Sequence, residues 1–177
     1  MSGVRAERIK TKFERNVRAL ELRPGVGRGT AVTTVRLTGG LACEIEEGPW
    51  RLASDLSEKS GGDNSAPNPG IIGRAALGTC LATSYALWAA KMGVEFDLLE
   101  VEVQADYDTR GMYGVDDVPP GYIQIRYVVT VESEASESEI MRVLDQADAC
   151  CDYLAVFRDP QDVRREVKIL DRSAKAE

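Results

Sequence analysis

The chain has 177 residues, with 29 acidic and 22 basic side chains and a formal net charge of −7. This length favours one domain that buries roughly 70% of its unfolded surface. The acidic balance disfavours non-specific binding to nucleic acid, and no apolar run approaches the ~20 residues that span a bilayer. We therefore expect neither a nucleic acid nor a membrane as partner. The sequence has no histidine, so any chemistry runs without the commonest proton shuttle and metal ligand.

The first 29 residues differ in charge from the rest. They carry eight Lys or Arg against three Glu, a net of +5, which leaves −12 for the remainder. Ile9, Phe13, Val17 and Leu20 recur at helical spacing. We expect an amphipathic helical arm over 1–29 that docks on an acidic surface such as another subunit, and a single α+β domain over 30–177. The arm lacks the apolar core of a secretory signal, which favours a cytoplasmic location.

The arm is followed by segments in which apolar residues alternate with period two. They predict strands over 31–37 and 41–47, joined by a Thr-Gly-Gly turn, and a third strand over 50–56. Cys43 shares a strand face with other apolar side chains and is expected to be a packing residue. Arg36 lies on the first of these strands.

A long helix is predicted over 69–92. Asn68 suits the N-cap, Pro69 the first helical position and Gly93 the C-terminal end. Apart from Arg74, nearly every position is apolar or small, so the helix should be buried on all sides. A domain this small needs a second subunit to provide that cover.

The remaining segments complete an α+β order rather than a doubly wound sheet. Strands are predicted over 98–106 and 122–131, around a long connection at 108–121. A capping box, Ser136 to Glu139, should open a second helix that runs through about residue 157. Residues 163–169 should form a final short strand.

Four cysteines are present: Cys43, Cys80, Cys150 and Cys151. In a cytoplasmic protein they are expected to be buried or redox-active thiols rather than a static disulfide framework. No histidine completes a zinc set, so no metal is expected. On the second predicted helix both Cys150 and Cys151 fit an apolar stripe, and periodicity does not choose between them. The aspartates of that helix are expected to form its solvated face: Asp145, Asp148 and Asp152.

Three segments together resemble the OsmC/Ohr family of thiol-dependent peroxidases. They are NPGIIGRAALGTC (68–80), VEVQADYDTRGMYGVDDVPPGY (101–122) and CDYLAVFRDP (151–160), and the likeness extends over about 31–170. The resemblance implies an OsmC-like α+β fold, in which antiparallel sheets wrap long central helices in an intertwined homodimer. It also places the second functional cysteine at Cys151, with Cys150 as the alternative.

The resemblance further implies a reaction. Cys80 would attack the O–O bond of an organic hydroperoxide and become a sulfenic acid. Cys151 would condense with it as a disulfide, which an external dithiol of the lipoyl type would reduce. No other cofactor is implied.

Family members lower the pKa of the first cysteine with an arginine from the N-terminal sheet and a glutamate near the start of the central helix. Arg36 is the preferred arginine here. Arg74 is the second choice, since six residues place it about 120° from Cys80 around the helix axis. The glutamate is missing, because Gly70 follows Asn-Pro in this chain.

The substrate pocket is expected to have apolar walls: Leu77, Leu81, Met112 and Tyr113. Gly70 favours an alternative function, a catalytically weak relative that binds a hydrophobic ligand or senses oxidation. A further alternative is an interaction protein that recognises its partner through the basic N-terminal helix.

Overall fold

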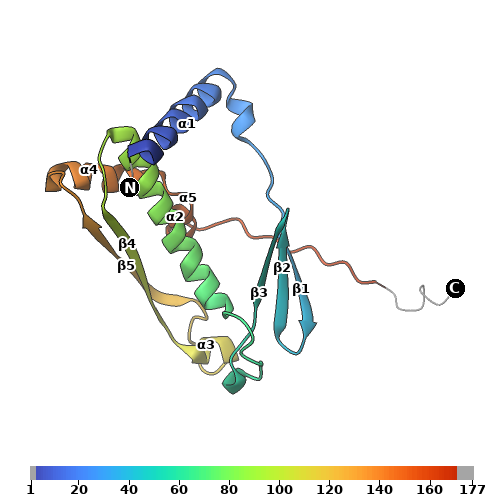
Figure 1. Ribbon diagram of the computed structural model, residues 1–177. Coiled ribbons are helices and arrows are strands. Elements are labelled where there is room, and N and C mark those ends of the chain that lie inside the picture. Colours follow the sequence, from blue (N-terminus) through green and yellow to red (C-terminus); the bar gives the residue numbers. More distant parts are fainter. Residues whose placement is uncertain (1–2, 171–177) are drawn as a thin grey trace.

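The computed structural model of the protein describes residues 3–170 (Figure 1). Residues 1–2 and 171–177, at the ends of the predicted arm and domain, lie outside the described residues. A long helix, α2 (Pro69–Met92), occupies the centre, and α1 (Gly3–Leu22) crosses one of its ends. A two-stranded sheet runs along α2, and a three-stranded sheet stands to one side of it.

The termini of α2 are those predicted. The Asn68 side chain accepts a hydrogen bond from the Ile71 N–H at 3.0 Å, and Gly93 ends the helix with a φ of +73°. Burial on all sides is wrong for a single subunit, since Ile71 and Leu87 are 45% and 41% exposed. Part of the apolar surface of α2 is therefore open in one chain.

The two-stranded sheet consists of β4 (Leu98–Tyr107) and β5 (Tyr122–Glu132), which pair antiparallel. Val101 lies opposite Val129, and both contact the core beside α2. The predicted alternation of this segment is therefore confirmed. The connection between the strands contains a short helix, α3 (Thr109–Tyr113), which the sequence pattern did not indicate.

The three-stranded sheet has the order β1 (Thr34–Gly39), β2 (Ala42–Glu47), β3 (Trp50–Ser54), with antiparallel pairs. The third strand ends two residues earlier than predicted. The Asp55 carboxylate turns the chain there, because it accepts hydrogen bonds from backbone N–H groups of the following loop. That loop carries a 3-10 turn, η2 (Glu58–Ser60), and another turn, η1 (Pro24–Gly27), follows α1.

The two faces of this sheet differ in character. Register places Val35, Ile45 and Leu52 side by side on one face, and Arg36 beside Glu44 on the other. Val35 and Leu52 are 58% and 59% exposed. The apolar face is thus unprotected in one subunit.

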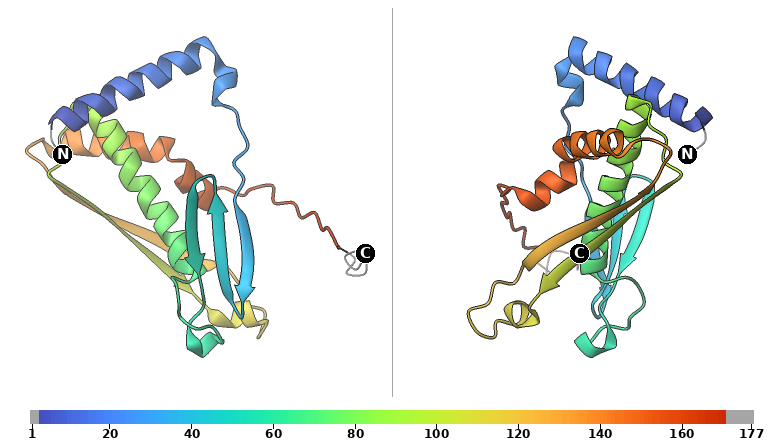
Figure 2. Two further views of the ribbon diagram at one scale, coloured as in Figure 1. Left: turned by 45° about the vertical axis from the view of Figure 1, so that its right-hand side comes forward. Right: turned by 90° about the vertical axis from the view of Figure 1, so that its left-hand side faces the viewer.

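The predicted second helix is in fact two helices. The capping box is confirmed at Ser136, and α4 runs over Glu137–Cys150. Cys151 then adopts an extended conformation (φ −81°, ψ 112°), and α5 covers Asp152–Arg158. The axes of α4 and α5 therefore point in different directions (Figure 2).

The predicted final strand over 163–169 is wrong. Residues 159–170 follow α5 as an extended segment without secondary structure, and Val163 and Ile169 are 88% and 90% exposed. Alternation alone does not make a strand, because a strand needs a neighbouring edge to pair with. No edge within residues 3–170 takes that place.

The core lies between α2, α4 and the β4–β5 sheet. Leu77, Leu81 and Tyr85 follow one side of α2 at four-residue spacing and meet Val143 and Ala147 of α4. Each of these side chains is at most 1% exposed, and full burial of such a side chain contributes about 1.5–3 kcal/mol. No helix in residues 3–170 is long and apolar enough to cross a membrane.

The predicted amphipathic helix is confirmed as α1, and it packs on α2 of its own chain. The Phe13 and Trp88 rings meet edge to face with centroids 5.1 Å apart. The Lys91 ammonium lies 4.8 Å from the centre of the Phe13 ring.

Candidate functional site

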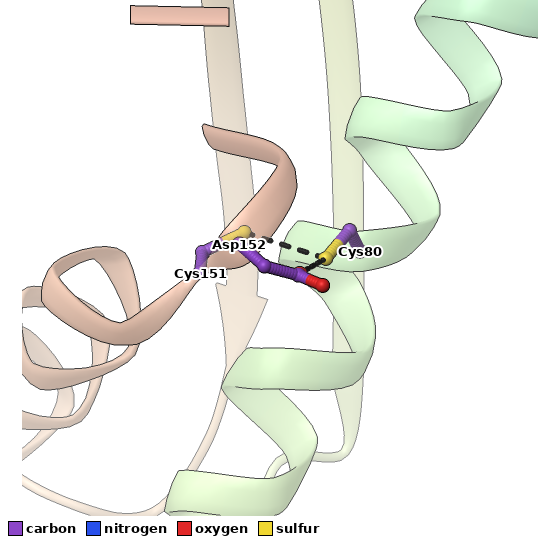
Figure 3. A group of neighbouring side chains, drawn as sticks. All are labelled: Cys80, Cys151 and Asp152. Carbon is purple, nitrogen blue, oxygen red and sulfur yellow. Dashed lines mark hydrogen bonds between the residues drawn. The ribbon is translucent and has the colours of Figure 1, made fainter. Parts of the chain in front are cut away.

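Cys80 and Cys151 come together in the structure. Cys80 lies on α2, one turn after Leu77, and Cys151 occupies the break between α4 and α5. Their sulfurs are 3.5 Å apart (Figure 3). Cys151 is 3% exposed, whereas Cys80 is partly exposed. Both thiols are free, so the pair can close a disulfide by approaching to about 2.05 Å.

The break at Cys151 decides which of the two vicinal cysteines faces Cys80. The Cys151 N–H still donates to the Asp148 carbonyl at 3.4 Å, and the Ala155 N–H donates to the Cys151 carbonyl at 3.0 Å. Cys151 is therefore held by both helices. Cys150 is exposed, and its sulfur accepts a hydrogen bond from the Gln146 amide at 3.3 Å. The geometry places Cys151, not Cys150, beside Cys80.

A carboxylate completes this cluster. The Cys80 thiol donates to Oδ1 of Asp152 at 2.8 Å (Figure 3). The same oxygen accepts from the Tyr153 N–H at 3.0 Å. Asp152 is exposed, as expected, but it also contacts Cys80, which the sequence did not predict because the helix breaks just before it. Nothing in the sequence predicts the contact between Cys80 and Asp152, because the helix break at Cys151 is itself not predicted.

The surroundings of Cys80 keep it protonated in a single subunit. Burial and the hydrogen bond to Asp152 raise the pKa of the Cys80 thiol to about 11. The Tyr153 N–H opposes this shift without cancelling it. The contact with Cys80 in turn lowers the pKa of Asp152. A thiolate at Cys80 therefore needs a cation that these residues do not supply.

A second polar network joins α2, β5 and α4 near the two cysteines. The Tyr85 and Tyr127 hydroxyls donate to the two oxygens of Asp148 at 2.7 and 2.8 Å. Burial, followed by the Asp148 carboxylate, raises the pKa of both phenols, that of Tyr127 to about 12. Asp148 was also expected on a solvated face, and this is wrong because it ties α4 to α2 and β5.

Neither candidate arginine contacts Cys80 within residues 3–170. Arg36 lies on the polar face of the three-stranded sheet and pairs with Glu46 at 2.9 Å. Arg74 lies on α2, and its guanidinium donates to the Tyr122 hydroxyl at 3.1 Å. A catalytic role for either arginine stays a prediction.

Gly70 lies beside Arg74 at the start of α2. A Cβ added there would lie 3.3 Å from Nη1 of Arg74 and 3.5 Å from the Tyr122 hydroxyl. In this chain Arg74 and Tyr122 thus adjoin the place where the resemblance expects a glutamate.

The four residues predicted to form pocket walls are not gathered around one cavity. Leu77 and Leu81 are core residues, 1% and 0% exposed, close to Cys151. Met112 and Tyr113 lie on α3 and are 59% and 61% exposed. A role in substrate binding stays a prediction for all four.

Comparison with known proteins identifies the family to which the chain belongs. Residues 62–166 match the family described as OsmC-like protein. The chain belongs to this family. A search of curated proteins found no significant match.

Solved structures of low sequence identity share the fold. An OsmC-like protein from Mycoplasma pneumoniae is 16% identical with a TM-score of 0.63; the likeness covers 73% of this chain and 88% of that one. An organic hydroperoxide resistance protein OsmC from Legionella pneumophila is 14% identical with a TM-score of 0.53, covering 73% and 90%. An OsmC-like protein of unknown function from Vibrio cholerae is 11% identical with a TM-score of 0.57, covering 73% and 94%.

Proposed function

We propose that the protein is a dimeric thiol peroxidase that reduces organic hydroperoxides through Cys80 and Cys151. The observation that carries this proposal is the 3.5 Å separation of the two sulfurs, which come from separate elements of the fold. Family membership and the likeness to a protein described as an organic hydroperoxide resistance protein support the substrate class. A reducing compartment such as the cytoplasm would keep the resting pair as thiols.

The reaction consists of two steps on the protein. The Cys80 thiolate attacks the terminal oxygen of ROOH; the O–O bond breaks, an S–O bond forms, and the leaving alkoxide takes a proton to become the alcohol. The Cys151 sulfur then attacks the sulfur of the Cys80 sulfenic acid, and water leaves as the disulfide forms. Both cysteines are oxidised while the peroxide is reduced. An external dithiol, which we propose is of the lipoyl type, returns the pair to thiols.

The unequal exposure of the two sulfurs suits their roles. Cys80 is the more accessible of the pair, as an attacking thiol requires, and Cys151 is 3% exposed. A buried resolving thiol meets the sulfenic acid before small thiols from solvent can reach it. The apolar side chains around Cys151 also favour organic peroxides over strongly hydrated ones.

A cation must lower the pKa of Cys80 for the first step to be fast. We propose that Arg36 of a second subunit supplies it, because Arg36 of the same subunit lies on the three-stranded sheet and forms no hydrogen bond with Cys80. Exposed apolar surface on that sheet and the open face of α2 support a dimer, since such surface is normally covered.

A matched pair of variants tests the role of Arg36. Arg36 and Arg51 lie on the same sheet and pair with the same carboxylate, each at 2.9 Å from Glu46. In Arg36→Ala, consumption of cumene hydroperoxide with dihydrolipoamide should fall at least about tenfold. Arg51→Ala should stay within about twofold of wild type. Equal effects of the two changes would remove Arg36 from the mechanism.

Oxidation sensing without turnover is the second candidate function. The high pKa of Cys80 favours it, because a protonated thiol reacts slowly with peroxides. In that case the disulfide would form under stoichiometric oxidant, but dihydrolipoamide would sustain no catalytic consumption of peroxide. Loss of all turnover in Cys80→Ser, with turnover retained in Cys150→Ser, would instead support the peroxidase.

A further inference from the structure

Three potential metal ligands converge where α2 meets the break between α4 and α5. The sulfurs of Cys80 and Cys151 and a carboxylate oxygen of Asp152 all lie within 4.8 Å of one another. The two sulfurs are 3.5 Å apart. In a tetrahedral site, zinc–sulfur bonds of about 2.3 Å hold two thiolates about 3.8 Å apart. The thiols therefore need to move by only a few tenths of an ångström to share one ion.

The described residues of one subunit place no cation in hydrogen-bond contact with the cluster. Within residues 3–170, no Lys or Arg forms a hydrogen bond or ion pair with Cys80, Cys151 or Asp152. Asp152 instead accepts hydrogen bonds from the Cys80 thiol and from the Tyr153 backbone N–H. Deprotonated, these three groups would carry three negative charges side by side. A divalent cation would offset these charges, so zinc and the proposed Arg36 of a second subunit are alternative sources of positive charge at this site.

We propose that the reduced protein binds one Zn²⁺ ion through Cys80, Cys151 and Asp152. Thiolates are soft ligands and a carboxylate is hard, a combination that suits borderline zinc rather than magnesium or calcium. Because Asp152 is exposed, a water molecule can serve as the fourth ligand of a tetrahedral ion. Both S–H protons are released to solvent as the two Zn–S bonds form, and no atom changes oxidation state.

The scaffold holds two of these ligands before metal arrives. Cys80 lies within the uninterrupted α2, and Cys151 is fixed by backbone hydrogen bonds to α4 and α5. Asp152 is exposed, so its carboxylate can rotate from the thiol proton onto the metal. A preorganised ligand set reduces the entropic cost of binding.

Zinc and the disulfide exclude each other, because they use the same two sulfur atoms. Oxidation of the pair would therefore release the ion, and zinc would block the reaction of both thiols with peroxide. Metal binding by these residues requires only that both thiols are reduced. The zinc proposal therefore does not depend on whether the protein turns over hydroperoxides.

The test is a cobalt titration of the reduced full-length protein under argon, followed by displacement with zinc. We expect a thiolate-to-cobalt charge-transfer band and the intense visible bands of tetrahedral Co²⁺, saturating at one ion per subunit. Zinc should abolish both. Competition with a chromophoric chelator then gives the zinc affinity.

Variants identify the ligands. Asp152→Asn should weaken zinc binding at least about tenfold, and Cys80→Ser at least about a hundredfold. Asp145→Asn and Cys150→Ser, at exposed positions of α4, should stay within about twofold. Circular dichroism checks that each variant is folded. Wild-type protein oxidised to the disulfide provides a test without mutation, because it should bind no cobalt.

Two results would overturn the proposal. One is a cobalt spectrum without thiolate charge transfer in the reduced wild type. The other is zinc affinity that is unchanged in Cys80→Ser or Asp152→Asn but lost in Cys150→Ser, which would place the ion on the surface of α4.

Discussion

Asp152 accepts a hydrogen bond from Cys80 at 2.8 Å and so acts on the sulfur that the proposed reaction requires to be reactive. Its carboxylate favours the protonated thiol, because ionisation of Cys80 would place two negative charges in contact. Burial acts in the same direction and is the larger cause. The site of one subunit is thus held in a resting state until a cation offsets this carboxylate.

Asp152→Asn should therefore lower the pKa of Cys80. The sign follows from the removal of a negative neighbour that stabilises only the protonated thiol. Each unit by which the pKa falls raises the thiolate fraction at neutral pH about tenfold. Alkylation of Cys80 by iodoacetamide, measured by peptide mass spectrometry across a pH series, should become several-fold faster at neutral pH.

Asp145→Asn is the control for this measurement, since it removes the same charge from an exposed position of α4. In this variant the pH dependence of Cys80 alkylation should be the same as in the wild type. A pKa of Cys80 that is unchanged or higher in Asp152→Asn would contradict the assignment of Asp152 as the group that restrains the thiol.

At this scale the sequence predicts part of the site. The Cys80–Cys151 pair followed from the family resemblance, whereas helical periodicity left Cys150 and Cys151 equivalent. Asp152 was missed because a continuous helix would place it with Asp145 on the solvated side. The extended backbone at Cys151 brings the exposed Asp152 into contact with Cys80, which a continuous helix does not predict.

At the scale of elements, the position of Cys151 depends on how α4 is fixed to α2. Two tyrosines, Tyr85 from α2 and Tyr127 from β5, donate to Asp148 of α4 at 2.7 and 2.8 Å. Asp148 also accepts the Cys151 N–H through its backbone carbonyl. The network thus connects three elements just before the chain reaches Cys151.

Tyr85→Phe should lower the free energy of unfolding by about 1–3 kcal/mol, because it leaves a carboxylate with one donor fewer at a buried position. Tyr85 is 0% exposed. Denaturation with urea, monitored by circular dichroism, measures the change. Tyr107→Phe, at a 66% exposed position of β4, should change the stability by less than about 0.5 kcal/mol. Equal stability of Tyr85→Phe and wild type would show that Asp148 does not tie the elements together.

Sequence signals worked for elements whose ends are determined locally. Asn68, Pro69 and Gly93 set the bounds of α2, and Ser136 with Glu139 sets the start of α4. They failed at residues 163–169, where strand formation depends on a distant edge. They also failed at Cys151, where neither glycine nor proline marks the interruption of the helix.

At the scale of the whole molecule, the three-stranded sheet leaves one face without cover. Its apolar side chains alternate in register with charged ones on the opposite face. The sequence predicted incomplete cover for α2 from its composition alone, and the structure shows open surface on both elements. Which surfaces meet in a dimer depends on geometry between chains, which periodicity does not encode.

We expect the protein to sediment as a species of twice the 19.3 kDa mass of one chain. Leu52→Lys should shift it toward monomer, because the charge lies on the apolar face of β3. Ala53→Lys places the same charge on the polar face, opposite Glu44, and should leave the mass unchanged. A wild-type protein that sediments as a monomer would contradict the dimer. Equal dissociation by Leu52→Lys and Ala53→Lys would contradict a dimer that forms through the apolar face of the sheet.

The central claim is that Cys80 and Cys151 form one redox pair, and the most direct measurement is disulfide mapping after a single turnover. Reduced protein is mixed with one equivalent of cumene hydroperoxide, quenched with an alkylating agent and digested for mass spectrometry. We predict a Cys80–Cys151 disulfide within seconds, retained in Cys150→Ser and absent in Cys80→Ser. Free thiols at both positions after excess peroxide, or a disulfide that involves Cys150 instead, would contradict the account.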